Sequence, residues 1–513
     1  MEFWLFFLIL SICLCAVLKL LVDLVSQNKS NQTNLSLPPG PLKVPLIGSF
    51  LWLQGGFSQI EQILSNLRHK YGPIITLHIG SQPSIFITNH SLAHQALIEN
   101  GASFADRPPT MSVLRLTNSN QHNINTASYG PLWRLLRRNL TSEILHPSRV
   151  KSFGHARKWV LEMLTERLNH HVQSGEPVRV MDHFQYTMFC LLVLMCLGEK
   201  LDEKVIREIE EAQRNLLVNA GRFRVFAFFG NLGKLVFRKR WHQLLEIRRR
   251  QESVLIPLIR ARRERKEKKQ ENPDDEFVVS YVDTLFDLQI PDERGRKLSE
   301  EEMVTLCSEF LNAGTDTTST ALQWIMANLV KHQEIQEKLH SEIEGVVSSG
   351  EERIKEEDLQ KITYLKAVVL EGLRRHPPGH FLLPHAVTED IVLDGHVIPK
   401  KATVNFVVSE MGWDPNVWKN PMEFNPERFL SNEGEIFDIT GTREIKMMPF
   451  GAGRRICPGL ALALHHLEYF VANLVRDFKW TAMDGEDVDL SEKQEFTVVM
   501  KKPLWAHISP RVK

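Results

Sequence analysis

The 513-residue sequence has little cysteine and no excess of charge of either sign. Six cysteines, two of them in an apolar N-terminal run, are too few for a disulfide framework in a chain of this size, and a reducing compartment is favoured. Lys plus Arg and Asp plus Glu each number 62, so the net charge of zero gives no indication of nucleic-acid binding. No long disordered spacer follows the first forty residues, and no alternation of strands and helices predicts a parallel sheet.

The N-terminus is predicted to be a membrane anchor. Phe3 to Val25 is almost wholly apolar and long enough to span a bilayer. A cleaved signal peptide is the alternative, but Glu2 and the lack of a convincing cleavage site favour a transmembrane signal anchor over residues 1–25. Lys19, Lys29 and Lys43 lie on the C-terminal side and indicate that this side faces the cytosol.

Residues 26–41 are predicted to be a linker with a stiff end. Their first part is rich in Ser, Asn and Gln, and the last four residues read Pro38-Pro39-Gly40-Pro41. The sequons at Asn28, Asn31 and Asn34 are expected to stay unglycosylated, because this topology keeps them in the cytosol.

Residues 42–513 are predicted to form one large, mainly α domain with a small β region. β-branched runs at 74–77 and 85–88 flank Gly80-Ser81 and predict a hairpin, and Asp394-Gly395 marks a second one. Long amphipathic stretches cover 157–173, 202–220, 241–271 and 299–348.

One cysteine stands apart from the others. Most unpaired cysteines are small buried hydrophobes, which is the interpretation for Cys190, Cys196 and Cys307. Cys457 instead follows two glycines, which allow a chain to lie flat against a planar group. Pro458 and a helical run come next, so Cys457 is predicted at the helix N-cap, where a thiolate is favoured over a thiol. Such a thiolate is a strong ligand for iron.

The residues around this cysteine match a known pattern. The fixed positions of Phe-x-x-Gly-x-Arg-x-Cys-x-Gly are filled by Phe450, Gly453, Arg455, Cys457 and Gly459. In this the chain resembles the cytochrome P-450 family of haem-thiolate monooxygenases, from the hinge to the C-terminal strands. The resemblance implies the cytochrome P-450 fold and haem b with Cys457 as its axial thiolate.

The resemblance also assigns a supporting network. It implies that Glu371 and Arg374, three apart on one helix face, form a buried ion network with Arg428. Because a buried carboxylate between two arginines is tolerable only when all are paired, the expected role is structural support of the haem-binding loop.

Further motifs concern oxygen and the haem edge. Ala313-Gly314-Thr315-Asp316-Thr317-Thr318 predicts a bent helix, in which Asp316 and Thr317 would deliver protons to dioxygen and Gly314 would leave it room. A merely bent Ser/Thr-rich helix is the alternative. The resemblance further implies that the haem propionates are held by Trp133, Arg137, His385 and Arg455. The neighbours Arg134 and Arg138 are expected to face outward.

Electrons must come from another protein, since no flavin or nicotinamide domain is recognisable. The resemblance implies a membrane-bound NADPH–cytochrome reductase, with cytochrome b5 as a second donor, at the endoplasmic reticulum. The substrate is expected to be lipophilic, as in the plant microsomal branch, and the loops that select it are 106–126, 219–237, 307–317, 380–384 and 494–499. The aromatic patch at 222–229 is interpreted as a lip touching the bilayer, with ordinary core as the alternative.

Two other classes of function stay open at this point. A haem-thiolate isomerase or dehydratase would need no reductase and no acid–hydroxyl pair such as Asp316 and Thr317. A non-catalytic membrane haem protein would need neither.

Overall fold

The computed structural model describes residues 36–41, 56–79, 82–110, 114–271, 278–291, 293–347, 353–430 and 437–511. The predicted anchor over residues 1–25 and most of the predicted linker lie outside these ranges. Within them, one helix is long and apolar enough to cross a membrane, α8 (Val180–Leu197). Its apolar window is 78% buried inside the fold, as is typical of a core helix.

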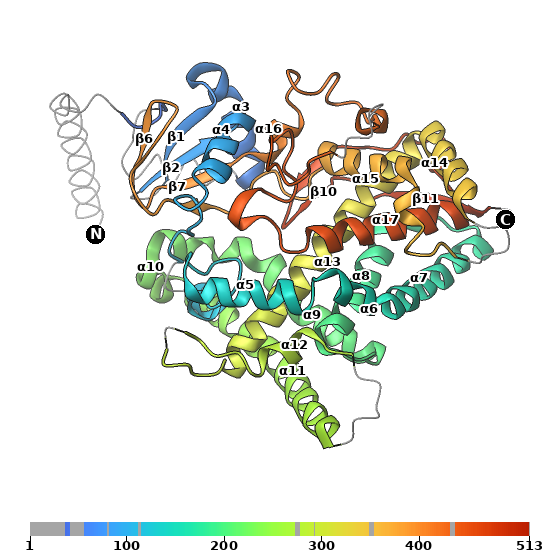
Figure 1. Ribbon diagram of the computed structural model, residues 1–513, viewed down its shortest axis with the longest axis horizontal. Coiled ribbons are helices and arrows are strands. Elements are labelled where there is room, and N and C mark those ends of the chain that lie inside the picture. The colour runs from blue at the N-terminus through green and yellow to red at the C-terminus, as the bar shows by residue number, and fades with distance from the viewer. Residues whose placement is uncertain are drawn as a thin grey trace, which may run out of the picture.

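The fold is mainly helical, as predicted. Figure 1 shows the β-sheet and α3 at one end of the molecule, with helices filling the rest and α13 crossing the middle. The main helices in chain order are α3 (Gly56–Tyr71), α4 (His90–His94), α5 (Pro131–Glu143), α6 (Pro147–Ser152), α7 (Gly154–Ser174), α8, α9 (Glu203–Asn219), α10 (Val225–Val236), α11 (Arg238–Glu271), α12 (Tyr281–Leu285), α13 (Glu300–Lys331), α14 (Gln333–Val346), α15 (Thr363–Arg375), α16 (Val408–Gly412) and α17 (Leu460–Asp477).

Both predicted hairpins are present. β1 (Ile74–Ile79) pairs antiparallel with β2 (Gln82–Ile87), and β5 (Ile391–Leu393) pairs with β6 (His396–Ile398) across Asp394 and Gly395. Both turn residues have positive φ, 51° and 72°, as a type I′ turn requires. The remaining strands are β3 (Val178–Arg179), β4 (His385–Ala386), β7 (Thr403–Phe406), β8 (Phe478–Thr481), β9 (Glu492–Gln494), β10 (Val498–Met500) and β11 (Trp505–Pro510).

The largest sheet contains a pairing that the sequence did not predict. Its order is β1-β2-β7-β4, and β2 and β7 run parallel, with Ile85 opposite Val404. The absence of strand–helix alternation therefore did not exclude a parallel pair, because the two strands come from opposite ends of the chain.

The amphipathic stretch 299–348 is two helices. α13 begins with a capping box between Ser299 and Glu302. It ends at Lys331, and α14 begins after His332. Gly314 has a packing role that the sequence did not predict: a Cβ built there would lie 2.1 Å from Cδ1 of Leu192 in α8. The glycine therefore allows close packing of α8 against α13.

A buried histidine ties α3 to the segment after α15. Nδ1 of His380 lies 2.8 Å from Glu61 Oε2, and Nε2 lies 3.2 Å from Glu492 Oε2. Burial opposes the charge, but the hydrogen bonds and charges of Glu492 and Glu61 outweigh it and raise the pKa of His380 to about 9. The ring is therefore an imidazolium near neutral pH.

The contacts of His380 with Glu61 and Glu492 predict that the protein loses stability at alkaline pH. A histidine with a raised pKa stabilises the fold fully below its unfolded value of 6.5 and progressively less as the pH rises through about 9. The contribution is on the order of 2–3 kcal/mol. In denaturant unfolding, His380→Gln should lower the free energy of unfolding by most of this contribution near roughly pH 6 and by little near roughly pH 10. An equal cost at both pH values would contradict the electrostatic role.

Candidate functional site: a haem-thiolate centre

Cys457 lies in a tight loop before α17. Its backbone N–H donates to the Phe450 carbonyl oxygen at 2.8 Å, and the Gly459 N–H is directed at its sulfur. Gly453 has a φ of 69°, and a Cβ there would lie 2.0 Å from the Leu97 carbonyl oxygen, so only glycine fits. The motif thus forms a loop that presents Cys457, which is half-buried.

The predicted helix start is wrong by two residues. The N-cap of α17 is Gly459, not Cys457, and the helix begins at Leu460. Burial raises the pKa of Cys457 and outweighs the Gly459 N–H and Arg137, which lower it. The loop alone therefore does not favour the thiolate, and a bound metal cation would have to supply the charge that deprotonates it.

Three predicted haem-edge residues meet beside this loop. The Arg455 guanidinium lies over the Trp133 ring at 4.4 Å and donates to the carbonyl oxygens of Ala105, Ile124 and Ala127. Trp133 is buried, and its Nε1 has no acceptor among the described residues. The third residue, Arg137, lies close enough to Cys457 for their charges to interact, and burial lowers its pKa. Such an orphaned donor beside arginines fits an acceptor group that the protein itself does not provide.

A third cation was not predicted as a site residue. The Arg107 guanidinium donates to the carbonyl oxygens of Asn125, Leu383 and Pro384 at 2.8–2.9 Å, and burial and Arg455 lower its pKa to about 9. None of Arg107, Arg137 and Arg455 forms an ion pair with a carboxylate of the described chain. The sequence offered no pattern that marks Arg107, although it lies within the expected substrate loop 106–126.

The predicted role of His385 depends on its charge. Its Nδ1 lies 2.7 Å from the Phe104 carbonyl oxygen, which can only accept, so Nδ1 carries the proton. Burial and Arg107 lower the pKa of His385 to about 3, and the neutral ring therefore presents an acceptor at Nε2. His385 can donate to a propionate only if that carboxylate lies close enough to raise the pKa of the ring, so that Nε2 also carries a proton.

The predicted oxygen-side residues lie on α13. Thr317 Oγ1 donates to the Ala313 carbonyl oxygen at 2.6 Å, the i−4 bond expected of a hydroxyl in a helix. Asp316 Oδ1 accepts from Gln185 Nε2 at 2.8 Å and lies 3.6 Å from Arg214. Burial raises the pKa of Asp316, against the effects of Gln185 and Arg214. α13 is one continuous helix, so the bend expected at residues 313–318 does not interrupt it.

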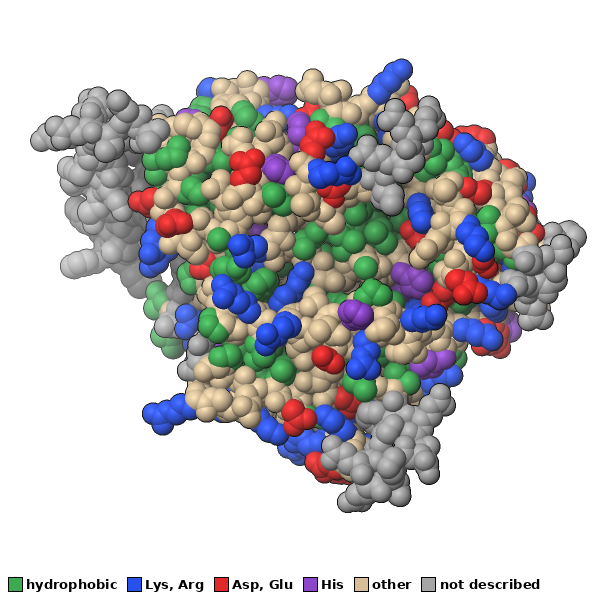
Figure 2. Space-filling view, in the orientation of Figure 1, with side chains coloured by type: hydrophobic (Ala, Val, Ile, Leu, Met, Phe, Trp, Pro, Cys, Tyr) green, Lys and Arg blue, Asp and Glu red, His purple; other side chains and the backbone are tan. Residues whose placement is uncertain are grey.

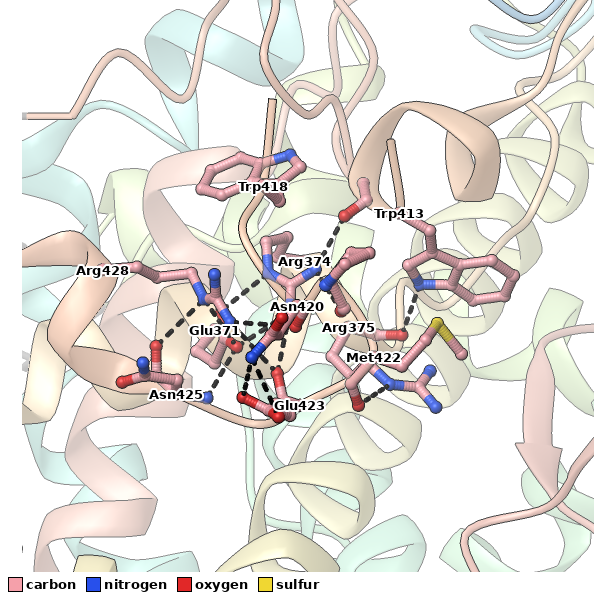
Figure 3. A network of polar contacts seen from close by, with 12 residues as sticks. Glu371, Arg374, Arg375, Trp413, Trp418, Asn420, Met422, Glu423, Asn425 and Arg428 are labelled. Atoms are coloured by element: carbon pink, nitrogen blue, oxygen red, sulfur yellow. Dashed lines mark hydrogen bonds and ion pairs between the residues drawn. The ribbon is translucent and has the colours of Figure 1, made fainter. Parts of the chain in front are cut away.

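The predicted ion network is complete. Both oxygens of Glu371 accept from Arg374, at 2.7 and 2.8 Å, and Oε1 also accepts from Arg428 at 3.1 Å and from the Asn425 N–H (Figure 3). The side chains of Glu371 and Arg374 are 0% exposed. Arg374 also donates to the Gly412 carbonyl oxygen at 2.7 Å, so the network holds together α15, α16 and the segment that leads to the haem-binding loop.

Comparison with known proteins finds relatives of one family over almost the whole chain. The family described as "Cytochrome P450" matches residues 38–508. The chain belongs to the cytochrome P450 family. It is 53% identical to cytochrome P450 89A9 of Arabidopsis thaliana, over 93% of this chain and 94% of that one. It is 30% identical to the flavonoid 3'-monooxygenase of the same plant, with 98% of each chain covered.

Solved structures of this family share the fold. The structure of a zebrafish cytochrome P450 with progesterone matches with a TM-score of 0.73 at 24% identity, covering 88% of this chain and 99% of that one. Cytochromes P450 are oxidoreductases that use a haem with a cysteine thiolate as axial ligand. Such a group has a planar ring and two carboxylates. It fits the thiol of Cys457, the glycine loop, the indole N–H that lacks an acceptor and the arginines that lack a carboxylate partner among the described residues.

Proposed function

We propose that this protein is a haem-thiolate monooxygenase that activates dioxygen with electrons from NADPH and inserts one oxygen atom into a lipophilic plant metabolite. The observation that carries the proposal is the convergence of Cys457, Trp133 and Arg455 on one site that fits a haem. We assign Cys457 as the axial ligand, and Phe450, Gly453 and Gly459 as the loop around it. Titrating the haem-loaded protein with candidate lipophilic compounds tests it, since a substrate shifts the haem spin state.

The chain's own residues hold the haem and move protons. When bound, a haem with a thiolate ligand supplies the electron-rich iron that cleaves the O–O bond. Trp133, Arg137 and Arg455, joined by Arg107, would hold its carboxylates. Asp316, whose pKa is raised by burial, would hold a proton at Oδ2, and the Thr317 hydroxyl would pass it toward the oxygen. Glu371, Arg374 and Arg428 would support the haem-binding loop.

The role of Thr317 gives a sharp prediction. Thr317→Ala should lower product formed per NADPH by about tenfold or more, with hydrogen peroxide released instead, because proton delivery is lost. The measurement compares NADPH oxidised, peroxide released and product formed. Thr318→Ala is the matched control, since Thr318 is the next residue of α13 and is buried at 6% exposure. Unchanged coupling in Thr317→Ala would remove Thr317 from this role.

Electron supply is proposed to come from a membrane-bound NADPH–cytochrome reductase, with cytochrome b5 as a second donor. Figure 2 shows basic side chains gathered over α5, where Arg134 and Arg138 are exposed, as expected from the sequence. Arg454, in the loop before Cys457, is exposed too, and donates to the Tyr129 hydroxyl at 2.8 Å. A positive surface beside the ligand loop favours the approach of an acidic redox protein.

We further propose that the protein is attached to the endoplasmic reticulum membrane. Residues 1–25 are the proposed anchor, 26–41 the linker and 42–513 the catalytic domain facing the cytosol. Leu232, Leu235 and Val236 of α10 are 61–70% exposed, far more than large apolar side chains usually are. A second contact of α10 with the bilayer would cover them.

The substrate is proposed to come from specialised metabolism or catabolism. Relatives that are 30% identical carry the names flavonoid 3'-monooxygenase and germacrene A acid 8-beta-hydroxylase, and they cover phenolic and terpenoid chemistry. An isomerase or a haem carrier would not consume NADPH. NADPH oxidation that depends on the reductase and yields an oxygenated product therefore separates the three functions.

A further inference from the structure

Three polar side chains on one face of α13 bind a neighbouring loop, residues 118–127. Glu302 Oε1 lies 2.6 Å from His122 Nδ1, and Thr305 Oγ1 lies 2.6 Å from Ser119 Oγ. One turn further along, Glu309 accepts two backbone N–H groups. Because the three helix positions follow the i, i+3, i+7 spacing, they form one continuous stripe.

Glu309 binds the backbone of this loop directly. Its Oε2 accepts from the Ile124 N–H at 2.9 Å and its Oε1 from the Asn125 N–H at 2.7 Å. Burial raises the pKa of Glu309 to about 7, against these two bonds and Arg107. The carboxyl group therefore fixes two consecutive peptide units, and a glutamine in its place would face one of the two N–H groups with an NH2 donor instead of an accepting oxygen.

The same two residues carry the carbonyls that hold the haem-edge arginines. Arg455 donates to the Ile124 carbonyl oxygen at 3.2 Å, and Arg107 donates to the Asn125 carbonyl oxygen at 2.8 Å. Each of these residues thus binds Glu309 through its N–H and an arginine through its carbonyl oxygen. Displacement of this backbone would move both guanidinium groups together.

The backbone of the loop is also strained at residues 119–121, next to Thr305 of α13. Ser119, Asn120 and Gln121 have φ of 45°, 59° and 68°, three successive non-glycine residues in the left-handed region. Such a conformation is unfavourable for non-glycine residues and persists only where its surroundings enforce it. The contacts from α13 are part of that enforcement, so the loop would relax if they were removed.

We propose that Glu309 is a positioning residue that sets Arg107 and Arg455 at the haem edge by fixing the loop backbone at Ile124 and Asn125. This rests on the proposed haem site and deepens it. Glu309 acts through the loop and not by contact with the haem. Thr305 and Glu302 hold the start of the loop, whose carbonyls do not contact these arginines, so they should matter less for the haem.

The test uses full-length, haem-loaded protein carrying Glu309→Gln, with Thr305→Ala as the matched control. Haem release to excess apomyoglobin should be about tenfold faster in Glu309→Gln, since one of the two hydrogen bonds that fix the loop backbone is lost. Amide hydrogen exchange in the peptide covering 118–127 should rise as well. Thr305→Ala should release haem at close to the wild-type rate.

A double variant keeps the test decisive if Glu309→Gln folds poorly. Arg107→Lys should speed haem release, and adding it to Glu309→Asp should have less than the multiplied effect, because both act through the Asn125 peptide. Wild-type release and exchange in Glu309→Gln, or an equal effect of Thr305→Ala, would overturn the proposal. The proposed function fails separately, if the wild-type protein lacks the red-shifted Soret band of its reduced carbon monoxide complex.

Discussion

Replacing Cys457 with histidine should abolish monooxygenase activity while leaving a haem protein that can be purified. An imidazole can still bind iron, but it cannot supply the electron donation of a thiolate that favours O–O cleavage. The reduced, carbon monoxide-treated variant should therefore lose the red-shifted Soret band. Absorbance spectra and product formation with reductase and NADPH measure both effects on the same sample.

Cys307→Ser is the control for this experiment. Cys307 is fully buried in α13 among apolar side chains, so its replacement changes a cysteine without touching the haem-binding loop. The control should keep the red-shifted band. A Cys457→His protein that still showed this band, or still formed product, would end the assignment of the axial ligand.

Glu371→Gln should destabilise the protein by about 3–5 kcal/mol, because it leaves the buried charges of Arg374 and Arg428 without their carboxylate. The side chain of Arg374 is 0% exposed and that of Arg428 only 10%, so water cannot replace the lost partner. The midpoint of denaturant unfolding should fall, and haem content after purification should fall with it. Tryptophan fluorescence reports this region directly, since Trp418 lies over Arg374 at 5.4 Å.

Glu427→Gln provides the comparison. Glu427, the residue before Arg428, pairs with Lys338 at 2.7 Å, but the two side chains are 48% and 51% exposed. Exposed ion pairs are worth about 0–1 kcal/mol, so this variant should unfold almost as the wild type does. If the two variants cost the same, burial would not be the reason that the Glu371 network matters.

The sequence predicted the haem site where its residues follow one another closely. The loop from Phe450 to Gly459 and the pair Glu371 and Arg374 are recognisable because short spacing fixes their geometry. Arg428 and Trp133 could be added through the family resemblance alone. In the structure Arg428 contacts Glu371, as the resemblance implies, and the Trp133 ring lies beneath the Arg455 guanidinium.

Contacts between distant segments could not be predicted. Arg107 is an ordinary arginine in the sequence, and only the folded chain brings it to the carbonyl oxygens of Leu383 and Pro384. Glu302 and Glu309 look like the solvent-facing residues of an amphipathic helix, yet both hold a loop. Gly314 matched the oxygen-binding motif, but its packing partner Leu192 is on another helix. Local patterns carry no information on such partners.

The parallel pairing of β2 with β7 has a consequence for biosynthesis. Asn405 reaches back to the carbonyl oxygen of Ile85, 320 residues earlier in the chain. At the usual pace of translation, of roughly 5–20 residues per second, the first hairpin waits tens of seconds on the ribosome for its neighbouring strand. The cysteine loop emerges later still, so the pigment can enter only after synthesis is nearly complete. Until then the exposed edge of β2 needs protection from other chains, which a chaperone could provide.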